Sequence, residues 1–491
     1  TADVEATSRC FLELIKREVF TPEELKVEVS YFQRFQQHNV ELIQPVGLKH
    51  LNLKQASEEI RKRASSGQGI NLADQKANLQ DLAAVDFAHL HNHSQFSILQ
   101  STISVPALVK AAAKHKMPAV ALTDHGNMMG AFHFVSNVLN HNKAAKAKNE
   151  AAKENGETPT ETIIKPIVGC EFFVCENHKD KSRKDNGYQV VLLAKNKKGY
   201  HNLAKMSSIA FTEGFYYIPR IDKSVIEQYK EDIIVLSGNL YGEIPNKILN
   251  MGEHQAEEAL VWWKQHFGED FYIELMRHNQ EDENRVNESL IKLAQKHDVK
   301  LVASNNTYYI DKKDAHPHDI LLCVKDGEKL ATPKGRGRGF RYGMPNEEYY
   351  FKSGDEMKKL FADIPEAIYN IQEVIDKIEI YSLYRDVLLP KFNIPEEFQV
   401  EEDEGDGGKR GENKYLRHLT YEGAARRYPE ITNDIRERLD FELKTIENTG
   451  YPGYFLIVQD FIAAARDMDV SVGPGRGSAA GSAVAYCLGI T

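Results

Sequence analysis

The sequence predicts an α/β protein whose central region is a barrel or parallel sheet of βα units. Between residues 86 and 386, short runs of β-branched residues alternate with longer stretches whose apolar residues recur at helical spacing. Six or more such units over roughly 300 residues favour a barrel-like arrangement. The expected strands are residues 119–122, 164–168, 190–193, 233–236, 271–275 and 301–304, and the helices expected between them include 106–115, 287–297 and 365–378.

The segments on either side of this region predict helices and connectors. The opening residues place most of their apolar side chains on one helical face, and the chain then loosens into polar, Ser- and Gly-containing sequence. An acidic, Gly-rich stretch after the barrel region has too few apolar residues to fold alone. We therefore divide the chain into a helix (1–20), a helical connector (21–85), the barrel domain (86–390), an acidic linker (391–414) and a final region (415–491) with helices, a short strand at 470–472 and a Gly-rich turn.

Composition limits the class of protein. The chain has 491 residues, of which 42% are hydrophobic and 27% charged, so it is long enough for about three folded domains. No apolar run approaches the roughly 20 residues that span a bilayer, and no secretory leader opens the sequence. Five scattered cysteines without a C-x-x-C pair predict reduced thiols and a cytoplasmic location. The net charge of -10 neither indicates nor excludes a nucleic-acid partner.

Three alternating histidines follow the start of the barrel region. In an extended segment His89, His91 and His93 project from one face and can converge on a single point. Imidazoles that converge at a strand end suit zinc or manganese. The alternative is a hydrogen-bonded structural cluster without metal.

Polar residues also follow the next two expected strands. Asp124 and His125 come after residues 119–122, and Glu171 comes after 164–168. The carboxyl ends of barrel strands meet at one rim, so these side chains are candidates for the same site. An Asx turn at Asp124 and a solvated Glu171 remain the alternatives.

A Gly-rich turn near the end of the sequence is a candidate phosphate site. Gly475 and Gly477 allow a close backbone approach, Arg476 can bind phosphate oxygens in a fork, and Ser478 offers a hydroxyl at a helix start. A turn of this composition can also serve tight packing alone.

The motifs occur in the order found in the polymerase-and-histidinol-phosphatase (PHP) domain of bacterial DNA polymerase III alpha subunits. The resemblance runs from about residue 87 to the last residue. It implies a distorted βα barrel followed by the first part of a mixed α+β polymerase palm. It is carried by residues 89–97, 123–127, 165–169, 192–200, 215–222, 449–461 and 472–482.

The PHP resemblance also implies which residues ligate metal. His91, His93, His125 and Glu171 match ligand positions of the family, whereas His89 precedes them. The remaining positions carry an amide or an aromatic side chain instead of a ligand: Gln100, Gln189, Phe211, Asn306 and Tyr308. Neutral amides cannot balance the charge of two or three divalent ions. We expect a degenerate PHP site that is not catalytic, with at most a residual Zn²⁺ or Mn²⁺.

The palm resemblance implies that Gly475, Arg476, Gly477 and Ser478 contact the triphosphate of an incoming nucleotide. The family polymerises with Mg²⁺ held by palm aspartates downstream of this turn, and no Asp or Glu follows Ser478 here. We expect a truncated polymerase with no catalytic residue of its own. Its full-length partners would be primer-template DNA, dNTPs, a proofreading exonuclease, the sliding clamp and other replisome subunits.

The opening helix resembles the end of a DEDD-type 3'-5' exonuclease. Asp3 matches an Asp that completes the two-metal site of that family, and its partner histidine would precede residue 1. The sequence thus suggests an exonuclease fused to a polymerase and cut at both ends. An ordinary amphipathic helix with an exposed Asp is the alternative.

A basic loop offers weaker candidates for DNA contact. Arg336, Arg338 and Arg341 are spaced by glycines and an aromatic residue, which can follow a phosphate backbone, although a solvated loop is the simpler interpretation. Two other functions stay open at this point: a stand-alone metal-dependent PHP phosphoesterase or exonuclease, and a PHP module that only docks a partner.

Overall fold

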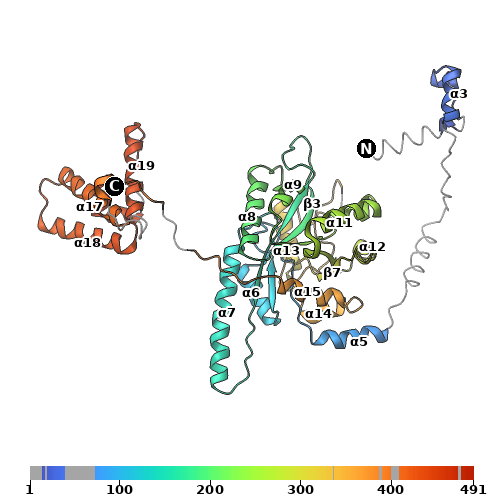
Figure 1. The fold of residues 1–491 in the computed structure, drawn as a ribbon, viewed down its shortest axis with the longest axis horizontal. Helices are drawn as coiled ribbons and strands as arrows, with labels where there is room; N and C mark the ends of the chain where they lie inside the picture. The colour runs from blue at the N-terminus through green and yellow to red at the C-terminus, as the bar shows by residue number, and fades with distance from the viewer. Residues whose placement is uncertain are drawn as a thin grey trace.

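A computed structural model describes residues 14–16, 19–38, 72–335, 337–385, 390–399, 409–473 and 477–491. Its centre is one curled seven-stranded sheet with helices around it (Figure 1). The strand order is β1-β2-β3-β5-β6-β7, with β4 paired to β2. The strands are β1 Ala119–Leu122, β2 Lys165–Cys175, β3 Tyr188–Ala194, β4 Arg220–Asp222, β5 Ile233–Leu236, β6 Phe271–Met276 and β7 Lys300–Ser304.

The sheet is mixed, which corrects the expectation of parallel strands throughout. β3 runs antiparallel to both β2 and β5, whereas β1, β4, β6 and β7 pair in parallel. A loop at residues 176–187 joins β2 to β3 without a crossover helix, so β3 must return antiparallel. All six expected strands are present.

The segment before β1 closes the curl of the sheet. Asn92 forms an isolated parallel bridge with Thr307, after β7. On the other side, the backbone of Ala121 donates to the carbonyl of His89. The histidine segment therefore lies between the first and last strands, and its side chains are placed by both.

Helices cover the outside of the sheet. Asn196 and Asp222 accept backbone hydrogen bonds at the first turns of α8 and α9 and so fix where these helices start. The helices are α6 Val105–Lys114, α7 Ala131–Glu154, α8 Lys197–Thr212, α9 Lys223–Tyr229, α10 Glu243–Asn250, α11 Glu253–Phe267, α12 Glu281–His297, α13 Ala315–Asp326, α14 Gly354–Leu360 and α15 Glu366–Asp376, with short 3-10 turns η1 Gly268–Asp270 and η2 Lys312–Asp314.

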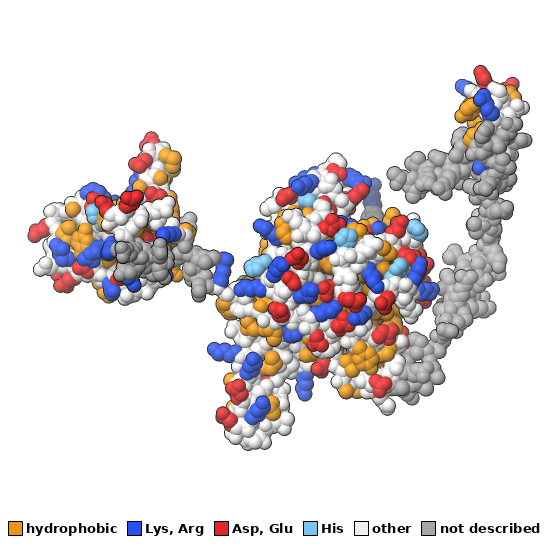
Figure 2. All heavy atoms as spheres, viewed as in Figure 1, with side chains coloured by type: hydrophobic (Ala, Val, Ile, Leu, Met, Phe, Trp, Pro, Cys, Tyr) orange, Lys and Arg blue, Asp and Glu red, His pale blue; other side chains and the backbone are white. Residues whose placement is uncertain are grey.

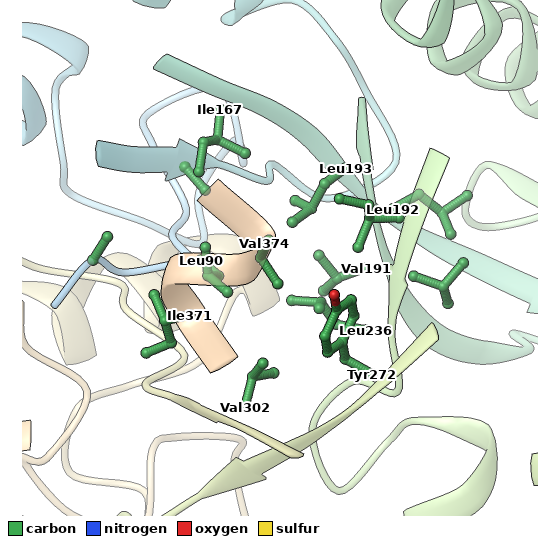
Figure 3. Packing of buried hydrophobic residues seen from close by; sticks show 14 of the residues in the cluster. Leu90, Ile167, Val191, Leu192, Leu193, Leu236, Tyr272, Val302, Ile371 and Val374 are labelled. Atoms are coloured by element: carbon green, nitrogen blue, oxygen red, sulfur yellow. The ribbon is translucent and has the colours of Figure 1, made fainter. Parts of the chain in front are cut away.

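The core of this domain includes a layer between the sheet and α15. Figure 3 shows Ile371 and Val374 of α15 facing Leu90 and Val302. All four side chains are fully buried, so the histidine segment and the last strand share one core. Hydrogen bonds from Asn370 to the Leu301 carbonyl and from Lys165 to the Ile375 carbonyl place α15 at the amino ends of β7 and β2, the end of these parallel strands away from the site.

Helices before the barrel domain complete the N-terminal part. α5 Leu72–Ala83 packs against α14, while α2 Pro22–Leu25 and α3 Val29–His38 precede it in sequence. Thr21 and Glu24 form a capping box at α2. Among the described helices, none combines the length and the apolar character that a membrane crossing requires.

Residues 409–491 form a helical unit with its own core. It contains α17 Lys409–Arg427, α18 Asn433–Thr449, α19 Pro452–Asp467, η4 Gly477–Gly481 and α20 Ala483–Cys487, with η3 Glu396–Phe398 ahead of it. Glu442 accepts hydrogen bonds from Ser482 and from the backbone of Val484, which ties α18 to the start of α20. The prediction of a strand at 470–472 is wrong, because these residues pair with no described strand and form a coil after the end of α19.

Candidate functional site

The histidine segment and β2 bring three ligand-type side chains to one point. His91, His93 and Glu171 are fully buried, and one ligand atom from each lies within 4.8 Å of the others. His93 Nε2 is 2.9 Å from Glu171 Oε2, and His91 Nε2 is 3.5 Å from Glu171 Oε1. These three side chains therefore lie close enough to share one ion, whereas His89, the first of the three alternating histidines, does not join them.

His125 joins the group from the loop after β1. Its Nδ1 lies 2.7 Å from Glu171 Oε2, and an isolated bridge joins the backbones of the two residues. The carboxylate is therefore shared by three imidazoles. This contact is short but does not have the geometry of a hydrogen bond, so Nδ1 of His125 has no hydrogen-bond partner among the described residues.

Glu274 of β6 is a site residue that the sequence reasoning missed. Its Oε1 lies 2.9 Å from Nδ1 of His91, and both side chains are fully buried. An ionised carboxylate only accepts hydrogen bonds, so Nδ1 of His91 carries the proton and Nε2 points toward Glu171. The available signal was a single Glu within the apolar run of β6.

The charges of the group depend on one another. Burial lowers the pKa of His91, but Glu274 and Glu171 outweigh it and raise the pKa to about 10. Burial raises the pKa of Glu171, but His125 and His91 hold it well below its ordinary value. Burial and the neighbouring His125 lower the pKa of His93 to about 3. Without an ion, His91 thus carries a proton on both ring nitrogens at neutral pH and balances the buried carboxylates, while His93 stays neutral. His91 releases the proton on Nε2 when it ligates a metal, and Nδ1 keeps its proton toward Glu274.

The hydrogen bonding of His93 fits a bound cation. A neutral imidazole has one N–H, yet Nε2 faces Glu171 and Nδ1 faces the carbonyl of Thr307 at 3.3 Å. One ring nitrogen therefore meets an oxygen lone pair without a proton between them. A divalent ion at Nε2 would remove this conflict, and imidazole with carboxylate suits Zn²⁺ or Mn²⁺.

Amide and phenol groups surround this centre. The Tyr308 ring stacks on His93 at 4.4 Å, and its hydroxyl lies 3.1 Å from Nε2 of His125. The amide of Asn239 donates to Glu171 Oε1 at 3.0 Å and to Gln189 Oε1 at 2.8 Å. These neutral groups occupy space beside the carboxylate without adding negative charge.

Phe211 does not take part in the site, contrary to the assignment from the sequence. Its ring is 42% exposed, stacks on Phe215 and is absent from the lining of the cavity described below. Asn239, in the loop after β5, lies beside Glu171 instead.

Two further polar residues have structural roles. Asp124 accepts hydrogen bonds from the Ser94 backbone, the Ser94 hydroxyl and the Ser97 hydroxyl, so it fixes the turn after the histidines. His89 points its Nε2 at the carbonyl of Lys352 at 2.8 Å. It lies outside the metal group, as the resemblance implied.

A cavity of about 660 Å³ opens beside this centre. His125, Tyr308 and Asn306 line one side of it, together with Gln100 and Gln189. Four of the five substituted positions, all but Phe211, therefore line this cavity.

The basic loop contributes less charge than its sequence suggests. Arg341 is buried and makes two hydrogen bonds to Asp319, at 2.9 and 2.8 Å, so it anchors the loop rather than facing a ligand. Arg338 is exposed and Arg336 lies outside the described residues. On the face shown in Figure 2, basic and acidic side chains are interspersed, without a single basic patch.

The remaining predicted residues are only partly described. Gly477 begins η4, and the backbone of Ser478 lies within it. Gly475, Arg476 and Asp3 lie outside the described residues. The expected nucleotide contacts stay a prediction.

Comparisons with known proteins agree with this architecture. Residues 89–278 match the PHP domain family, and residues 414–491 match the bacterial DNA polymerase III alpha NTPase domain. DNA polymerase III alpha subunits align with most of the chain: 40% identity over 410 residues in Borreliella burgdorferi (82% of this chain, 32% of the relative) and 37% over 415 residues in Treponema pallidum (84% and 32%).

The chain spans about a third of the length of these relatives. The subunit of Thermus aquaticus is 35% identical over 478 residues, covering 82% of this chain and 36% of the relative. A solved structure described as a metal-dependent phosphoesterase, from Bifidobacterium adolescentis, covers 52% of this chain and 93% of its own at 14% identity and a TM-score of 0.27.

Proposed function

We propose that this chain is the N-terminal region of a bacterial DNA polymerase III alpha subunit, a replicative DNA-directed DNA polymerase. The observation that carries the proposal is the order of the two family matches, PHP domain first and polymerase domain second, within a chain aligned to alpha subunits over 82% of its length. The full-length protein would add dNTPs to a primer with Mg²⁺, alongside template DNA, a sliding clamp, a proofreading exonuclease and other replisome subunits.

Within this function, Gly475, Arg476, Gly477 and Ser478 would contact the triphosphate of the incoming nucleotide. The turn lies inside the segment that matches the polymerase family. Arg476 supplies a fixed positive charge that forks onto phosphate oxygens, and glycines allow the backbone to approach them. In this proposal the boundaries 86–390 and 415–491 mark the PHP domain and the entry to the palm.

Primer extension by the full-length protein tests the polymerase proposal. Arg476→Ala should raise the KM for dNTPs about tenfold to a hundredfold, since a hydrogen bond to a charged group contributes about 1.5–3 kcal/mol. Arg338→Ala, in the exposed part of the basic loop, is the control and should leave this KM unchanged. Absence of any primer extension by the wild-type protein would refute the proposal.

For the PHP domain, we propose a scaffold that holds one divalent cation and does not hydrolyse phosphoesters. His91, His93, His125 and Glu171 would hold the ion, and Glu274 would keep His91 in the ligating tautomer. The ion would supply positive charge to the buried carboxylates and so tie the histidine segment to β2 and β6.

The surrounding residues support a role without hydrolysis. Two-metal or three-metal hydrolysis needs several anionic ligands to balance the ions and activate water. In this cavity Gln100, Gln189 and Asn306 are neutral, and Tyr308 covers one face of His93. Burial also raises the pKa of the Tyr308 hydroxyl well above its ordinary value, so this group carries no charge at neutral pH.

The exonuclease assignment of the opening helix rests on its own short resemblance. Both family matches begin after residue 88. We keep a fused proofreading exonuclease with Asp3 in its site as a proposal. Its test is peptide mapping of the protein from its source cells, where tryptic peptides that continue an exonuclease sequence before Thr1 would support it.

A further inference from the structure

A group of exposed aromatic side chains lies outside the metal group, at residues 211–217 between the end of α8 and β4. We call this segment the aromatic loop. Phe211 and Phe215 stack on each other with ring centroids 6.2 Å apart and are 42% and 47% exposed. Tyr217 is 65% exposed and packs edge-on against the ring of Tyr216. Apolar rings that are exposed as a group, rather than singly, indicate a binding surface.

The backbone of Tyr217 is held in a conformation that bulky residues rarely adopt. Its φ is +67°, in the left-handed region. The amide of Tyr216 donates to the Ile218 carbonyl at 3.2 Å, which closes the turn around Tyr217. Backbone strain of this kind is concentrated at ligand sites, and here it accompanies a ring that adds little to the core. The ring of Tyr217 is therefore placed for contact with a partner.

A second loop lies against the aromatic loop. It joins β2 to β3 at residues 176–187. Arg220 of β4 is fully buried, and its guanidinium donates to the Gly214 carbonyl at 3.0 Å and to the Asp185 carbonyl at 2.9 Å. The planar fork of donors thus holds one carbonyl from each loop. The two loops form one surface.

Two cations of the β2–β3 loop are available next to the rings. Nζ of Lys184 lies 5.0 Å from the centroid of the Tyr217 ring, within the range of a cation–π contact. Lys181 is exposed, and no ion pair joins it to another described residue. The other two cations of the loop are paired with glutamates: Lys179 with Glu213, and Arg183 with Glu176.

Exposed rings beside unpaired ammonium groups fit a strand of unpaired nucleotides. Bases stack on aromatic faces, and each nucleotide brings a phosphate that a lysine can neutralise. An apolar protein partner would bury Lys181 and Lys184 without a counter-charge, and a duplex would hide its base faces. We propose that the aromatic loop and the β2–β3 loop together bind single-stranded DNA, with a base on Tyr217 and a phosphate beside Lys184.

The choice of DNA rests on the proposed polymerase function, because the template strand ahead of a primer is unpaired. Binding of an oligonucleotide requires neither dNTPs nor primer extension, so the two proposals can fail separately. If the full-length protein extends no primer while the oligonucleotide binds as described below, the polymerase function falls and this surface stands.

Fluorescence anisotropy of a labelled oligothymidine of about 12 nucleotides tests the proposal with the 491-residue chain. Tyr217→Asn removes the ring but keeps a residue type that tolerates a positive φ. It should weaken binding about tenfold, within the contribution of one base stacked on one ring. Tyr217→Phe keeps the ring and should bind as the wild type does. Tyr369→Ala is the control, because Tyr369 is an exposed ring of α15 outside both loops, and it should also bind normally.

A duplex of the same length separates stacking from attraction by charge. Tyr217→Asn should leave duplex affinity unchanged, and equal losses for duplex and single strand would overturn the stacking. Oligothymidine that binds Tyr217→Asn and wild type equally, or binds neither, would overturn the site. Lys184→Gln should reduce the slope of log affinity against log salt by about 0.7, the contribution of one phosphate contact on a single strand. An unchanged slope would overturn the role of Lys184.

Discussion

Removing the charge of Glu274 is the most informative perturbation of the candidate metal site. Within the described part of this site, Glu274 pairs with His91, at 2.9 Å, and both side chains are fully buried. In Glu274→Gln, the amide oxygen can still accept from Nδ1 of His91, so the ligating tautomer is kept while the charge is lost. In Glu274→Ala, the acceptor is lost as well.

The expected magnitude follows from this contact. A hydrogen bond to a charged group contributes about 1.5–3 kcal/mol and a neutral one about 0.5–1.5 kcal/mol. The difference predicts a loss of Zn²⁺ affinity of roughly tenfold in Glu274→Gln and roughly a hundredfold in Glu274→Ala, within the range seen for carboxylates behind metal-bound histidines.

Competition with a chromophoric chelator at neutral pH measures both affinities. Glu283→Gln is the matched control, because Glu283 is also a buried carboxylate 2.7 Å from a histidine Nδ1 but lies outside the metal group. It should leave Zn²⁺ affinity unchanged. Equal losses in Glu274→Gln and Glu283→Gln, or no loss in Glu274→Ala, would refute the role assigned to Glu274.

Three further predictions concern stability and the basic loop. Burial raises the pKa of Asp222, but hydrogen bonds from Ser224 and His178 outweigh it and lower the pKa from 3.8 to about 2. Asp222→Asn should therefore lower the free energy of unfolding, measured with urea at neutral pH, by about 2 kcal/mol. This difference should shrink as the pH falls from 4 to 2, because Asp222 then becomes protonated in both the unfolded and the folded protein. A Cβ on Gly423 would meet the Cys487 carbonyl oxygen at 1.9 Å. Gly423→Ala should therefore destabilise the helical unit at 409–491 by about 1–3 kcal/mol and speed its proteolysis. Gly481→Ala is the control and should do neither, because a Cβ there meets nothing within 4 Å. Arg341→Ala should speed proteolytic cleavage within 330–344, because the loop loses its two hydrogen bonds to Asp319 and keeps only the ion pair of Lys334 with that carboxylate. Cleavage unchanged from wild type would contradict the anchoring role.

The alternation of strands and helices was readable from the sequence because each element carries its own periodicity. All six expected strands formed, since runs such as 233–236 and 301–304 can be buried on both faces only inside a sheet. The direction of β3 was not readable in this way. It depends on the length of the loop at 176–187, which apolar periodicity does not report.

The candidate site was predicted where a motif marks it and missed where only the fold does. His91 and His93 alternate in one extended segment, and Glu171 follows the expected strand 164–168, so their meeting could be expected from a barrel. The strand itself is longer than expected, because β2 continues through Glu171 to Cys175. Glu274 lies on β6 and contacts His91, and Asn239 lies in the loop after β5 and contacts Glu171. Both contacts depend on the curl of the sheet, which no local motif reports. The resemblance also counted Phe211 among the substituted positions, whereas its ring is exposed and lies outside the described cavity.

The metal content of the purified chain tests the account of the PHP domain most directly. After loading with Zn²⁺ or Mn²⁺ and removal of excess ion, elemental analysis should find one ion per wild-type chain and none in His91→Ala. The loaded protein should hydrolyse neither nucleotides nor a phosphodiester probe. Two or three ions per chain, with hydrolysis that His91→Ala abolishes, would contradict a scaffold that holds a single cation.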